Sequence, residues 1–206
     1  MRKRILTIGL AMLMATSLVA CSDNGKKIES RKEVSKKTEA TADESKTGEI
    51  VEEDGMKKVP VITDKKLNKK GKTGPIKYNI KAIQVSEFTA TTDDMANALD
   101  IEKNKEYTLV AMDVSFENTS EKTICFYPDQ GEITTNTKEQ VAADMFFSDS
   151  VGGDFIGNVR KEGTLFFVLK KTNANDIDTI SYHVDAPSNE DFESVGDNLE
   201  VELNFE

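Results

Sequence analysis

One thiol and one imidazole are the side chains in this sequence that could form a catalytic pair. Cys125 and His183 are the candidates, because a thiolate beside an imidazole is a recurring nucleophile and base. Cys125 lies between Ile124 and Phe126, which favours a small buried side chain instead. His183 falls on the polar phase of an alternating segment, which predicts an outward, solvated position. We therefore expect no catalytic residues and no enzyme.

Metal binding has little support in the composition. One His and two Cys exclude a three-histidine or four-cysteine zinc site and an ordinary four-thiolate iron–sulfur cluster. Asp149 and Asp154 flank two glycines and are weak candidates for Ca²⁺ ligands, but they lack the ordered spacing of a calcium loop. A flexible hairpin tip is the alternative. No nucleotide-binding or nucleophile-elbow motif occurs, so we expect no cofactor.

Residues 1–20 have the layout of a bacterial secretory signal peptide. Arg2, Lys3 and Arg4 precede fifteen uncharged residues, 5–19. This apolar run is shorter than the roughly 20 residues that a permanent membrane helix needs. A retained membrane helix is the alternative interpretation.

The end of this segment resembles the lipobox of bacterial lipoproteins, through Leu18, Val19, Ala20 and Cys21. The resemblance implies that the Cys21 thiol receives a diacylglycerol and that the chain is cleaved between Ala20 and Cys21. Two acyl chains anchor a protein stably where one does not. We therefore expect a protein that is lipid-anchored to the cell membrane and faces outward.

Residues 21–73 are predicted to be the lipidated cysteine followed by a disordered, charged tether. Residues 1–73 contain no aromatic residue, and a segment rich in Lys, Glu, Thr and Ser buries too little apolar surface to fold alone. Five lysines gather near its end and could contact anionic lipid headgroups or phosphate-rich wall polymers; simple solvation is the alternative. These lysines are Lys65, Lys66, Lys69, Lys70 and Lys72.

Residues 74–206 carry the period-two pattern of half-buried strands. Leu199, Val201, Leu203 and Phe205 alternate with polar residues, and similar alternation occurs in 107–116 and 179–184. The phase switches between Ala82 and Ile83, which predicts a bulge. Residues 164–170 are apolar on both phases, which predicts a strand covered on both faces. We expect seven or eight strands in an antiparallel sandwich.

One short helix is predicted where Thr92 precedes Asp93 and Asp94. Thr is a favourable N-cap, and acidic residues are favourable in a first helical turn.

This all-β domain resembles the immunoglobulin-like domain of many Gram-positive lipoproteins of unknown function, which is related in fold to a secreted mycobacterial antigen. The resemblance covers about residues 76–206. It rests on EYTLVAMDVSFENTS with KTICFYP and on KEGTLFFVLKK, and its marks are Asn118, Ser120 and Gly163. It implies an immunoglobulin-like antiparallel β-sandwich displayed at the surface, with no established catalysis and no functional residues to transfer.

Charge narrows the range of partners. The net charge is −10 over 206 residues, which argues against nucleic acid. We expect a non-catalytic binding domain for an extracellular or envelope protein, a peptide or a wall component, in addition to the membrane contact of the lipid. An ion- or small-solute-capturing lipoprotein is the alternative, and a small envelope enzyme is a third, weaker hypothesis.

Overall fold

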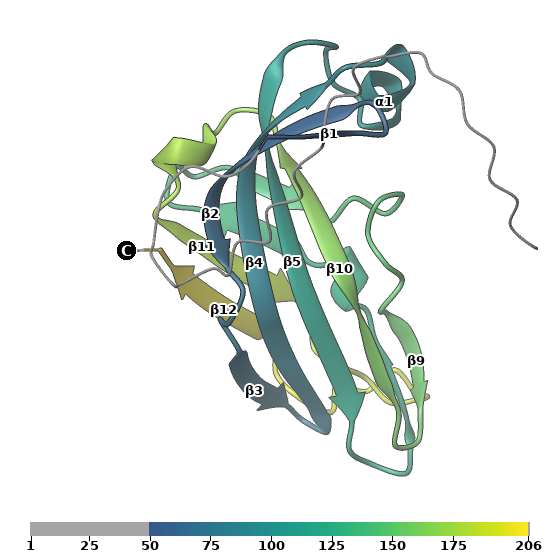
Figure 1. Cartoon of the computed structure of the whole chain (residues 1–206). Coiled ribbons are helices and arrows are strands. Elements are labelled where there is room, and N and C mark those ends of the chain that lie inside the picture. The colour runs from purple at the N-terminus through teal and green to yellow at the C-terminus, as the bar shows by residue number, and fades with distance from the viewer. Residues whose placement is uncertain (1–49, 206) are drawn as a thin grey trace, which may run out of the picture. The chain divides into compact units, whose positions relative to one another are not determined.

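The computed structural model describes residues 50–205, and strands dominate them (Figure 1). The signal peptide, the lipobox with Cys21 and residues 22–49 of the predicted tether lie outside the described residues. The strands are β1 (Val51–Glu53), β2 (Met56–Asp64), β3 (Lys69–Thr73), β4 (Ile76–Ala90), β5 (Glu106–Asn118), β6 (Thr123–Phe126), β7 (Glu132–Thr135), β8 (Gln140–Ala142), β9 (Gly153–Ile156), β10 (Arg160–Leu169), β11 (Thr179–Val184) and β12 (Leu199–Asn204). The helices are α1 (Asp93–Ala98) and the short 3₁₀ turns Pro128–Gln130 and Ala174–Asp176.

The largest sheet has six strands in the order β1-β2-β4-β5-β10, and β3 pairs with the part of β4 that β2 leaves free. Every pair is antiparallel, which confirms the predicted β-rich, antiparallel class. The register between β4 and β5 shifts between Ile80 and Ala82. The predicted bulge is therefore confirmed.

A second sheet, β12-β11-β7-β8, lies behind the first in Figure 1 and shares its apolar core. Phe167 of β10 meets Tyr182 of β11 edge-on, with ring centroids 6.2 Å apart. The β6–β9 pair adds Phe126 and Phe155 to the same core. The side chains of β11 and β12 alternate with period two, so that one face of each strand is buried in this core and the other face is polar.

Strand β10 is covered on both faces, as residues 164–170 predict. Leu165 and Phe167 point into the main core. On the opposite, outer face of the six-stranded sheet, Phe166 packs against a smaller cluster that includes Phe88 and Leu99. The helix α1 begins at the predicted cap, where Thr92 Oγ1 accepts a hydrogen bond from the Met95 N–H.

The predicted tether is wrong for residues 51–73, which form β1, β2 and β3. Val61, Ile62 and Leu67 pack against the main core, and β2 pairs with β4 from Met56 to Asp64. The sequence did not reveal these strands because their many lysines resemble a solvated tether. At a sheet edge, lysines are favourable because they discourage pairing with other chains. The folded domain therefore begins more than twenty residues before residue 74.

Candidate functional site

Cys125 is oriented differently from the prediction. Ile124 and Phe126 are buried in the core, whereas Cys125 points to the other side of β6 and is half-buried. Its Sγ donates a hydrogen bond to Asp154 Oδ1 over 3.2 Å, since Asp154 lies directly opposite on β9. This hydrogen bond, with a smaller contribution from burial, raises the pKa of the Cys125 thiol. The arrangement disfavours the thiolate that a nucleophile requires.

His183 lies on the outer face of the four-stranded sheet, and its ring makes a different contact. Its Nε2 is 3.0 Å from Thr134 Oγ1, and its cross-strand neighbours are Glu132 and Glu200. His183, Glu132 and Glu200 line an open polar groove of about 510 Å³. The thiol and the imidazole therefore bond to separate partners and do not form the pair that the sequence left open.

Asp149 and Asp154 serve as hydrogen-bond acceptors within the fold. Asp149 Oδ2 accepts the Thr164 N–H at 2.8 Å, and Asp154 accepts the Cys125 thiol. Within residues 50–205, apart from the side chains left undescribed, no group of three or more His, Cys, Asp or Glu residues is placed to hold a metal ion. The hypothesis of a calcium site at these two aspartates therefore finds no support in the geometry.

The residues that mark the family resemblance have structural functions. Asn118 is fully buried, and its Nδ2 donates to the carbonyls of Lys122 and Phe155 at 2.7 and 3.0 Å. Its Oδ1 accepts the backbone N–H and the hydroxyl of Ser120. A Cβ at Gly163 would lie 2.5 Å from the Asp149 Cβ, so only glycine lets residues 149–151 cross over β10.

The five predicted lysines divide between a turn and a strand. Lys65 and Lys66 lie in the connection between β2 and β3, while Lys69, Lys70 and Lys72 belong to β3. All five are exposed. Pairing of β3 with β4 places Lys72 directly opposite Lys77, so the cluster continues onto the sheet.

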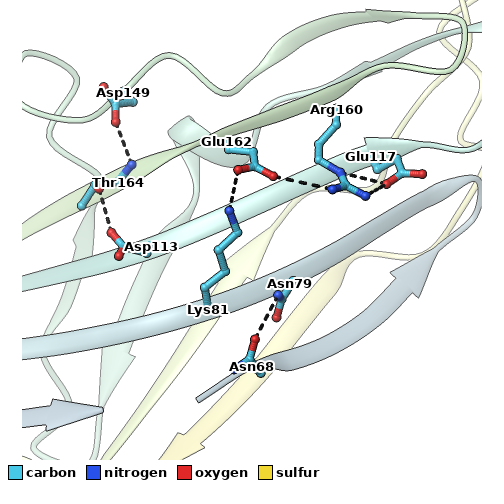
Figure 2. A network of polar contacts seen from close by, with 9 residues as sticks. All are labelled: Asn68, Asn79, Lys81, Asp113, Glu117, Asp149, Arg160, Glu162 and Thr164. Atoms are coloured by element: carbon cyan, nitrogen blue, oxygen red, sulfur yellow. Dashed lines mark hydrogen bonds and ion pairs between the residues drawn. The ribbon is translucent and has the colours of Figure 1, made fainter. Parts of the chain in front are cut away.

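Figure 2 shows a network of charged side chains on the outer face of the six-stranded sheet. Lys81 Nζ lies 2.6 Å from Glu162 Oε2, and Arg160 Nε donates to Glu117 Oε2 over 2.9 Å. Arg160 Nη1 is also 3.8 Å from Glu162 Oε1. The network therefore joins β4, β5 and β10 across the sheet.

Cations lower the pKa of both acids in this network. For Glu117 the main cause is the hydrogen bond from Arg160, with a smaller electrostatic contribution from Lys77. For Glu162 the hydrogen bond from Lys81 is the main cause. Glu162 is exposed and Glu117 is partly exposed to solvent, so these pairs orient side chains more than they stabilise the fold.

A groove of about 310 Å³ lies beside this network, and its basic lining residues are Lys70, Lys77, Lys81 and Arg160. We call it the lysine groove, and we include Lys72, which faces Lys77 at the groove's edge. Residues 65–81 contain seven lysines and no Asp or Glu, a pattern that could have indicated Lys77 and Lys81 from sequence. Arg160 could not be found in this way, because strand pairing brings it from 79 residues beyond Lys81 in the chain.

The helices of the described residues include none that is long and apolar enough to cross a bilayer. No protein-family model matches the chain. The SPbeta prophage-derived uncharacterized lipoprotein YonS of Bacillus subtilis (strain 168) is 26% identical over 164 residues, which cover 78% of this chain and 72% of that protein. This likeness supports a bacterial lipoprotein of unknown function.

Solved structures resemble the fold at low sequence identity. A functionally unknown protein from Listeria monocytogenes EGD-e has a TM-score of 0.52 and 16% identity, covering 77% of this chain and 88% of its own. The YjhA protein from Bacillus subtilis has a TM-score of 0.42 and 13% identity, covering 68% and 98%. The first of these likenesses supports the β-rich fold and says nothing about activity.

Proposed function

We propose that the protein is an envelope lipoprotein, anchored through diacylglycerol on Cys21, that displays a non-catalytic binding domain on the outer side of the cell membrane. The observation that carries this proposal is the likeness of this chain to a Bacillus lipoprotein over 164 residues. The lipobox-like residues Leu18, Val19, Ala20 and Cys21, which follow an uncharged run in this chain, agree with it. A diacyl anchor would keep the domain at the surface.

The proposed domain is an immunoglobulin-like sandwich, related in fold to the secreted mycobacterial antigen. Two antiparallel sheets that share one core support this assignment. Domains of this architecture often bind partners through loops, sheet edges and exposed faces. The proposed partner is an extracellular or envelope protein, a peptide or a wall component.

The proposal of a non-catalytic function is supported by how the two candidate side chains are used. The Cys125 thiol is held by Asp154, which disfavours its thiolate, and His183 contacts Thr134. Neither side chain is oriented by the other, as nucleophilic catalysis would require.

Replacing Cys21 tests the anchor. With Cys21→Ala, we expect incorporation of an alkyne-labelled fatty acid to fall to background, and the chain to stay uncleaved or to leave the cell. The matched control is Cys125→Ala, which removes the other thiol and should keep full labelling. Labelling that persists in Cys21→Ala would refute the proposal.

A further inference from the structure

We propose that the lysine groove binds a polyol-phosphodiester polymer, in which phosphodiester anions alternate with hydroxyl-bearing carbon units. The inference rests on the proposed outward-facing location, because such a polymer would be met outside the cell. It adds a site and a ligand class to that function. The phosphates would contact the lysines, and the hydroxyl groups would contact an unpaired acceptor in the groove.

Charge is the first observation. Residues 65–81 contain seven lysines and no Asp or Glu, whereas residues 87–206 contain 26 acidic and 8 basic residues. Glu117 and Glu162 also line the lysine groove, but Arg160 and Lys81 are paired with them. The three remaining lysines, Lys70, Lys72 and Lys77, make the groove a basic region in an acidic domain. A local region of this sign concentrates polyanions that the rest of the domain repels.

The pairing of β3 with β4 is the second observation. Lys72 and Lys77 are direct cross-strand neighbours, and like charges in this position destabilise a sheet. Among the described residues, no ion pair within 4.0 Å involves Lys70, Lys72 or Lys77. The other cross-strand neighbour of Lys77 is Glu117, but that carboxylate is bound by Arg160. A phosphodiester between Lys72 and Lys77 would remove the repulsion and satisfy both ammonium groups.

The spacing of these lysines suits a chain of anions better than a single anion. Lys70 and Lys72 are two residues apart on one strand, which separates them by roughly 7 Å, and Lys77 lies about 5 Å away on the next strand. Lys81 and Arg160 are already held by Glu162 and Glu117. We therefore place successive phosphates at Lys70, Lys72 and Lys77, with the paired cations forming the far end of the groove.

The unpaired side-chain oxygen of Asn79 favours a ligand that carries hydroxyl groups. Asn79 lines the groove, and its Nδ2 donates to Asn68 Oδ1 at 3.4 Å (Figure 2). Its Oδ1 is inaccessible to solvent in the free protein and has no hydrogen-bond partner. A buried acceptor without a donor is unfavourable, and a ligand hydroxyl reaching this oxygen after a small side-chain movement would supply the donor.

The side chains around the groove favour a polymer over a bilayer. The exposed large apolar side chains of the described residues include none from the groove, although bilayer docking usually requires them.

The test measures binding of a fluorescent glycerol-phosphate oligomer to the full-length protein in nonionic detergent micelles, by anisotropy at several salt concentrations. Lys70→Gln, Lys72→Gln and Lys77→Gln are combined in one variant. The control combines Lys122→Gln, Lys138→Gln and Lys171→Gln, which are exposed lysines elsewhere with the same total change in charge. Lys77→Gln alone is the second variant, and thermal melts check that each variant is folded.

We expect the groove variant to weaken binding roughly a hundredfold, at about fivefold per lysine, and to flatten the dependence on salt. The control should weaken it less than threefold, and Lys77→Gln alone about fivefold. Equal losses in the groove and control variants, or no saturable binding, would overturn the site. The assay is independent of the lipid, so its failure would leave the Cys21 result standing.

Two competitors identify the ligand chemistry. Phosphatidylglycerol in the same micelles should compete at least tenfold less effectively per phosphate than unlabelled oligomer; equal competition would assign the groove to lipid headgroups and overturn the polymer. Inorganic polyphosphate has no hydroxyl donor for Asn79 and should also compete less well. If it matched the oligomer, the polyol part of the inference would be wrong.

Discussion

Glu139 is a buried carboxylate that organises backbone groups at one end of the core. It is 8% exposed, and its oxygens accept the N–H groups of Lys170, Lys171 and Thr172 at 2.7 to 3.1 Å. These donors follow the last residue of β10. The side chain thus connects the β7–β8 hairpin to the end of β10.

Replacing Glu139 should destabilise the domain strongly. Glu139→Ala leaves three backbone donors without their charged acceptor, and hydrogen bonds to charged groups contribute about 1.5 to 3 kcal/mol each. Because water can reach the freed N–H groups and replace part of these bonds, we expect the free energy of unfolding to fall by less than their sum, by about 3 kcal/mol, in urea denaturation. Glu202→Gln, on the exposed face of β12, is the control and should change it by less than about 0.5 kcal/mol.

Cys125 should react slowly, because its raised pKa keeps the thiol protonated at neutral pH. The rise in its alkylation rate should therefore occur at higher pH than for an ordinary cysteine. Asp154→Asn removes the charge that disfavours the thiolate, so we expect this rise to move to lower pH and the rate at pH 8 to increase severalfold. Iodoacetamide labelling followed by mass spectrometry measures both. An unchanged pH profile would contradict the account of the Cys125–Asp154 contact.

At the scale of elements, the sequence predicted strands well where one face is apolar and the other polar. β11 and β12 alternate strictly, and Thr92 marks the start of α1. β3 has the sequence KKGKT, which contains no apolar residue to mark a buried face. Its pairing with β4 is local, through the two-residue turn at Gly74 and Pro75, so β3 could not be predicted because it lacks apolar alternation and not because its partner is distant.

The corrected domain boundary can be tested by truncation. A chain that begins at residue 74 lacks β1, β2 and β3, so β4 would lose both strands that pair along one of its edges and the core would lose Val61, Ile62 and Leu67. We expect this chain to aggregate or to melt without cooperativity. A chain that begins at residue 50 should retain a cooperative thermal transition by circular dichroism. Equal melting temperatures for the two chains would restore the original boundary.

At the scale of the whole molecule, the outer face of the six-stranded sheet is divided in two. One part carries the apolar cluster around Phe88 and Leu99, next to α1, and the other carries the charged network and the lysine groove. The net charge of the chain does not reveal this division, because the lysines are local and the acids are spread over the later strands. The sequence alone therefore predicted the lysine cluster, but not the strand pairing that brings further cations beside it.

The β1–β2 hairpin also determines how the domain would respond to mechanical load. Its three residue pairs run from Val51 with Lys58 to Glu53 with Met56, and β1 contributes no residue to either core cluster. Tension applied on the amino-terminal side of Ile50 acts on the outermost pair first and separates the pairs one after another, which requires less force than shearing them together. Stretching would detach β1 from the edge of the six-stranded sheet while the other strands stay paired, so the chain could gain a few residues of extra length under strain and recover them on release.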